Sequence, residues 1–158
     1  MPAKIKGWEG ASHLSEFDDG TSHIFVNVGS PGMWSSPPHR TIIAGYAEDD
    51  KLDQVWDAPG TFVSKMITRK YDLALSMNYS AFPGYPQVSR IWDVFRSRYI
   101  ARLMQEFGIK VIPDIQYGLG TIDTDIEFCT DGLPDEIPAI SIQTQNWGSG
   151  TQYLRDEA

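Results

Sequence analysis

The sequence predicts an α/β domain with a mostly parallel sheet and crossover helices. A long amphipathic helix is expected over residues 86–107, and a short β-branched run follows it without a hairpin turn. From Thr41 onward, expected strands alternate with expected helices, which favours parallel strands joined by right-handed crossovers. A partial barrel is one arrangement that this order allows.

Three apolar runs predict strands in the first half of the chain, at residues 24–28, 41–46 and 72–77. Residues 29–40, which are rich in proline and glycine, predict a loop between the first two. Two short helices are expected between the second and third strands, and Asp57 and Pro59 separate them.

The long helix begins near Pro86, whose missing N–H costs nothing in a first turn, and ends at Gly108. Five large apolar residues recur at steps of three and four, so one face is expected to be buried: Trp92, Phe95, Tyr99, Leu103 and Phe107. Ile91, Ile100 and Met104 are expected to widen this face. Strands are expected at residues 109–115 and 138–143.

The chain is expected to form one domain over residues 1–145, with a loop-rich part at residues 1–40 and a polar tail at residues 146–158. The net charge of −8 argues against direct binding to nucleic acid, because phosphates require clustered Lys and Arg. The single cysteine, Cys129, is expected to be a buried thiol in a reducing compartment. With no long apolar segment, we expect no membrane contact and a cytoplasmic location.

Four segments carry a family resemblance: I-W-D-V-F-R-S-R at 91–98, G-I-K-V-I-P at 108–113, the acidic residues 48–50 with V-W and P downstream, and F-C-x-D-G-x-P at 128–134. In this order they resemble the domain of unknown function 4417 family of phage, prophage and mobile-element proteins. The chain departs from that pattern at Asn78 and Tyr117, where an aspartate and a tryptophan are expected. The resemblance implies a shortened C-terminus, a phage context (hence a host-cell cytoplasm) and no particular reaction.

Polar residues follow the expected strands, and ligands bind at the carboxyl ends of parallel strands. These residues are Glu48, Asp49, Asp50, Asn78, Ser80, Asp114, Gln116, Tyr117, Gln143, Gln145 and Asn146. Asp114, Asp49 and Asp50 are the candidate catalytic or cation-binding groups. The candidate ligand-binding residues are Asn78, Ser80, Arg96, Gln116, Tyr117 and Gln143.

Structural roles compete with these assignments. Asp49 and Asp50 also suit the start of a helix, where carboxylates satisfy free N–H groups. Arg96 lies close to the apolar stripe, which favours a buried ion pair over a ligand contact. The N-terminal histidines and carboxylates between His13 and His23 lack the spacing of a metal motif, and no cofactor is identified.

Two functions remain open. The first is a binding protein that acts on a host or viral protein through an acidic surface, or that forms a homo-oligomer through an incomplete sheet. The second is an enzyme or binder of a small polar ligand that uses the strand-end residues.

Overall fold

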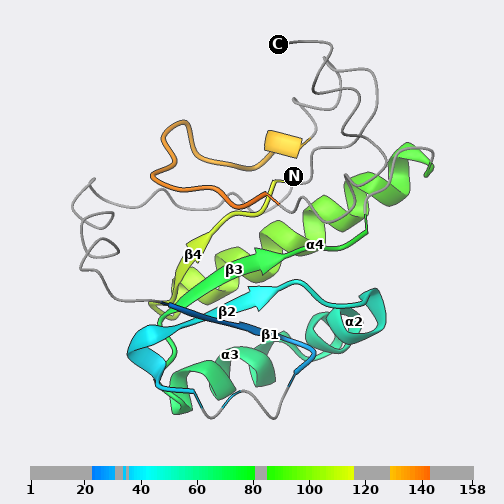
Figure 1. The fold of residues 1–158 in the computed structure, drawn as a ribbon. Coiled ribbons are helices and arrows are strands. Elements are labelled where there is room, and N and C mark those ends of the chain that lie inside the picture. Colours follow the sequence, from blue (N-terminus) through cyan, green and yellow to red (C-terminus); the bar gives the residue numbers. More distant parts are fainter. Residues whose placement is uncertain (1–22, 31–33, 35, 81–84, 116–128, 143–158) are drawn as a thin grey trace, which may run out of the picture.

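The computed structural model describes residues 23–30, 34, 36–80, 85–115 and 129–142. Its four strands form one sheet in sequence order, and every neighbouring pair is parallel (Figure 1). The strands are β1 (Ile24–Asn27), β2 (Thr41–Gly45), β3 (Leu73–Met77) and β4 (Lys110–Ile112). The predicted α/β class with a parallel sheet is therefore confirmed, whereas the described strands do not establish a barrel.

Helices connect the strands as the sequence predicts. A 3-10 turn, η2 (Pro38–Arg40), precedes β2, and α2 (Asp49–Asp57) and α3 (Pro59–Thr68) lie between β2 and β3. The long helix α4 (Gln87–Glu106) lies between β3 and β4 and packs on both of them. In Figure 1, α2 and α3 lie beside β1 and β2, and α4 runs alongside β3.

The two faces of the sheet have different partners. Alternate strand residues such as Val26, Ile43 and Ala74 share one core cluster with side chains from all three helices. The intervening residues form a second cluster that contains no helical side chain, namely Ile42, Ala44, Leu73 and Leu75 with Tyr46 and Ile112. Because sequential parallel strands with crossovers of one hand place their helices on one side, the three helices cover the same face.

The last predicted strand, at residues 138–143, is much reduced. Its described part makes one isolated parallel bridge, between Asp114 and Ser141. The Ile115 N–H donates to the Ser141 carbonyl (2.8 Å), and the Ser141 N–H donates to the Pro113 carbonyl (2.9 Å). This contact still extends the edge of the sheet beyond β4. It brings Ser141 next to Asp114 at the ends of the strands.

The predicted orientation of α4 is wrong for its aromatic stripe. Trp92, Tyr99 and Phe107 are 40–58% exposed, whereas Ile100 and Met104, which were expected to widen the buried face, are buried. The buried residues of the helix are Ser97, Arg98, Ile100, Ala101 and Met104. The helix carries apolar residues on two sides, and periodicity alone did not separate the two. The smaller side chains pack on the sheet because they allow a close approach.

Candidate functional site

A buried carboxylate joins the ends of three strands. Asp114, just after β4, is 3% exposed and its Oδ1 accepts a hydrogen bond from the Tyr46 hydroxyl (2.6 Å). Its Oδ2 accepts one from the Asn78 amide (2.8 Å), and its backbone N–H donates to the Ser76 hydroxyl (2.8 Å). The Tyr46 hydroxyl also contacts the Ser141 hydroxyl closely. We call these five residues the strand-end network.

Burial shapes the electrostatics of this network. Burial raises the pKa of the Asp114 carboxyl, although hydrogen bonds from Tyr46, Ser141 and Asn78 oppose the shift. The pKa of the Tyr46 hydroxyl is raised by burial and then by its bond to Asp114. Both groups therefore favour their neutral forms more than they would in water. The network combines a carboxyl and a phenol that resist ionisation.

Arg98 supplies a buried positive charge beside the network. It is 2% exposed, and its Nη2 and Nε donate to the Cys129 carbonyl (2.8 Å) and the Asp131 carbonyl (3.2 Å). Burial lowers its pKa to about 10, an effect that the negative charge of Asp114 opposes. Arg98 thus ties α4 to the segment after residue 128. Cys129 itself is buried, as predicted.

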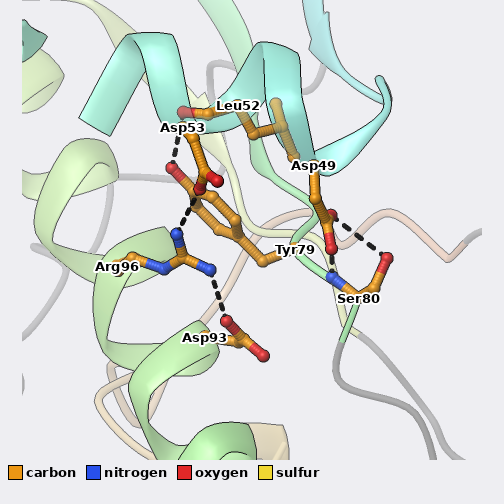
Figure 2. A network of polar contacts seen from close by, with 7 residues as sticks. All are labelled: Asp49, Leu52, Asp53, Tyr79, Ser80, Asp93 and Arg96. Carbon is orange, nitrogen blue, oxygen red and sulfur yellow. Dashed lines mark hydrogen bonds and ion pairs between the residues drawn. The ribbon is translucent and has the colours of Figure 1, made fainter. Parts of the chain in front are cut away.

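A second network links α2 to α4 (Figure 2). The Arg96 guanidinium lies between the carboxylates of Asp53 and Asp93, at 2.5 Å from each, and stacks on the Tyr79 ring at 3.8 Å. The Tyr79 hydroxyl donates to the Leu52 carbonyl (2.9 Å). Burial raises the pKa of Asp93, although its hydrogen bond from Arg96 opposes this. Arg96 has the predicted ion pair, and a ligand contact for it stays a prediction.

The other residues predicted for the site lie outside the strand-end network. The Asp49 carboxylate accepts hydrogen bonds from the Ser80 N–H (3.2 Å) and hydroxyl (3.1 Å), which fastens the first turn of α2 to the chain after β3. Asp50 faces solvent and pairs with Lys51 at 3.3 Å. The strand-end network thus includes Asp114 and Asn78 but not Asp49 or Asp50. Five predicted residues lie outside the described part of the chain: Gln116, Tyr117, Gln143, Gln145 and Asn146.

Sequence reasoning missed several polar residues in or beside these networks. Tyr46 directly follows β2, so the strand-end rule would have selected it had the predicted strand stopped one residue earlier. Ser76 lies inside a strand, and Asp93, Ser97 and Arg98 lie on a helix that periodicity had placed the other way round. A buried Ser-Arg pair inside an apolar helix gives no local signal. Only the tertiary structure assigns these residues.

A small cavity separates the two networks. Its volume is about 10 Å³, and it lies where α4 meets the ends of β3 and β4. Seven residues line it: the oxygen-bearing Asp93, Ser97 and Asp114, the positively charged Arg98, and the less polar Met77, Val94 and Cys129. In the part of the chain that the structure describes, no three His, Cys, Asp or Glu residues are grouped to hold a metal ion.

An aromatic surface covers the side of α4 that faces away from the sheet. Val88, Ile91, Trp92 and Tyr99 are 72%, 50%, 47% and 40% exposed. The Trp56 ring of α2 packs edge-on against Trp92 at 5.1 Å and against Tyr99 at 5.6 Å. We call Trp56, Val88, Ile91, Trp92, Phe95 and Tyr99 the outer aromatic surface. Among the described helices, none is long and apolar enough to cross a membrane.

Comparison with known proteins shows where related sequences occur. A family model described as a domain of unknown function (DUF4417) matches residues 14–149. The chain is similar to the Gene 1 protein of Mycobacterium phage L5 (29% identity; 64% of this chain, 45% of the relative). It is also similar to the Gene 1 protein of Mycobacterium phage D29 (27% identity; 73% of this chain, 42% of the relative). The chain thus spans less than half the length of these curated relatives. No solved structure matches it significantly.

Proposed function

Because the chain belongs to the domain of unknown function 4417 family and is similar to mycobacteriophage proteins, we propose that it binds a protein of the host or of the virus. The outer aromatic surface is the proposed docking site. Its exposure is the single observation that carries the proposal. Tryptophan and tyrosine are enriched among the residues that dominate the energy of protein interfaces.

The amphipathic pattern of α4 supports this reading. Its inner side contributes Ile100, Ala101 and Met104 to the core, and its outer side is also apolar over the first three turns. An apolar stripe on a helix normally packs against a core or a partner. Contiguous exposed apolar surface on a soluble domain marks an interaction site. A partner protein that covers the outer side of α4 would bury these exposed apolar side chains.

Charge indicates the chemistry of that partner. The acids Asp50, Asp53 and Asp57 recur along α2 at helical spacing, beside Trp56. Lys51 and Arg96 pair with two of them, but the chain as a whole carries a net charge of −8. Such a field attracts positively charged proteins and speeds their association. We therefore assign the partner as a basic protein that packs apolar side chains on the outer aromatic surface.

Matched glutamate substitutions test the proposal. Val88→Glu and Ile91→Glu place charges on the outer aromatic surface, whereas Ile67→Glu places one on α3 at a similar exposure of 46%. All three are exposed helix positions, so each change is expected to alter the free energy of unfolding by less than about 0.5 kcal/mol. The tagged chain is purified from its host, and any protein that copurifies is then purified separately and titrated by calorimetry.

The proposal predicts one basic partner whose affinity falls at least roughly tenfold with Val88→Glu or Ile91→Glu and is unchanged by Ile67→Glu. Its dissociation constant should also rise with salt. If all three variants bind the partner as tightly as the wild type, the outer aromatic surface is not the docking site. A dimer that Val88→Glu dissociates, with no second protein, would show that the surface pairs two copies of this chain and would refute the assignment of a basic partner.

A further inference from the structure

The cavity between the two networks has the size and lining of a binding subsite. Its volume of about 10 Å³ is close to the room that one water molecule requires. Ser97 and Asp114 line it and are 6% and 3% exposed, while the Asp93 side chain keeps 12% exposure. Asp93 is thus a partly exposed wall of the cavity. The cavity lies at the carboxyl ends of β3 and β4, where α/β proteins bind ligands.

Two lining side chains carry groups that can bond to an occupant. The Ser97 hydroxyl belongs to a residue that lines the cavity and is 6% exposed. Buried hydroxyls almost always find a partner in the protein or in ordered water. The Asp93 carboxylate has one oxygen that Arg96 does not contact (Figure 2). An occupant of the cavity would satisfy both groups.

Charge selects a neutral occupant. Asp93 already pairs with Arg96, and the charge of Arg98 already acts on Asp114. An anion would face two carboxylates, and a cation would face the Arg98 guanidinium. Burial raises the pKa of both carboxyls, and the charges of Arg96 and Arg98 oppose the rise. A hydroxyl group fits, because it donates to a carboxylate and accepts from Ser97.

We propose that this cavity is a subsite for a hydroxyl group, held by Asp93, Ser97 and Asp114, and that one water molecule occupies it when no ligand is bound. A small polyol would place one hydroxyl in the cavity from the Asp93 side. This site is separate from the outer aromatic surface, so it does not depend on the proposed partner. It also gives a role to Ser97, which neither network uses.

The test uses ethylene glycol as the probe and two serine variants. Ser97→Val fills the cavity with a methyl group. Ser97→Ala removes the hydroxyl but keeps the cavity open. Ser64→Val, on an exposed face of α3, controls for a β-branched residue in a helix. Crystals grown without polyols are examined for ordered water, and the amide resonances of residues 93–98 are followed as the probe is added.

We expect one ordered water within hydrogen-bond distance of Ser97 and at least one of the two carboxylates. Ethylene glycol should shift the amides of residues 93–98 in a saturable way, and Ser97→Ala should weaken this binding by about tenfold. Ser97→Val should abolish it, and Ser64→Val should not change it. Ordered water with no response to the probe would refute the ligand subsite. An empty cavity would refute the whole proposal, and Ser97→Ala keeps the test valid if Ser97→Val does not fold.

Discussion

Replacing Asp114 with asparagine removes one charge from the strand-end network and keeps the size of the side chain. The new amide oxygen still accepts from the Tyr46 hydroxyl, but its NH2 group meets the NH2 group of Asn78. The hydrogen bond from the Asn78 amide to this side chain is lost, and removing one partner of a buried hydrogen bond costs about 1–3 kcal/mol. Relief of the buried charge offsets part of this. We expect a loss of about 2 kcal/mol, or about 4–8 °C in Tm.

The loss should depend on pH. Burial raises the folded-state pKa of Asp114 above its unfolded value, so the folded chain binds more protons between those two values. The contribution of Asp114 to stability is therefore fully present at low pH and falls as pH rises through this window. Asparagine has no such titration. The gap between the wild type and Asp114→Asn should be largest near pH 4 and narrower at pH 7.

Urea denaturation at several pH values measures this gap. A reciprocal variant, Asn78→Asp with Asp114→Asn, restores a donor opposite an acceptor and should recover at least half of the lost stability. The reasoning is refuted if Asp114→Asn is as stable as the wild type across the range. It is also refuted if the gap widens as the pH rises, since that would mean a lowered pKa.

Two further changes test the packing around these networks. A methyl group at Gly45 would lie 2.3 Å from the Ser76 carbonyl oxygen, so Gly45→Ala should cost about 3 kcal/mol or more, whereas Gly60→Ala meets no atom within 4 Å and should be neutral or stabilising. Thermal melts of both variants compare them, and equal melting temperatures would contradict this geometry. Arg96→Met leaves the Asp93 carboxylate without its partner and should cost about 3 kcal/mol. A loss below about 1 kcal/mol in urea denaturation would show that solvent already screens this pair.

The fold class and the succession of strands and helices along the chain were predictable because they depend on local patterns, whereas the order of the strands in the sheet was not predicted. The runs at residues 41–46 and 72–77 are short, apolar and bounded by turn residues, and each forms a strand within one residue of its expected ends. The extent of α4 was equally predictable, because Pro86 marks its start and Gly108 its end. Its orientation was not, because Trp92 and Met104 are both apolar and only packing against β3 and β4 decides which side is buried.

The candidate site was only partly predictable, for a related reason. The rule that ligands gather at strand ends selected Asp114 and Asn78, which do meet. It could not separate them from Asp49, which also follows a strand but packs against Ser80. Ser97 gave no signal at all, since a serine within a helix is ordinary until its neighbours are known.

Site-specific photocrosslinking tests the proposed docking surface most directly. A photoreactive residue placed at Val88, the most exposed position of the outer aromatic surface, is compared with the same residue at Ile67 on α3. Each variant is expressed and irradiated in the host cell. The proposal predicts one discrete adduct with a basic protein from position 88 and none from position 67. Equal labelling from both positions, or adducts of this chain with itself alone, would contradict it.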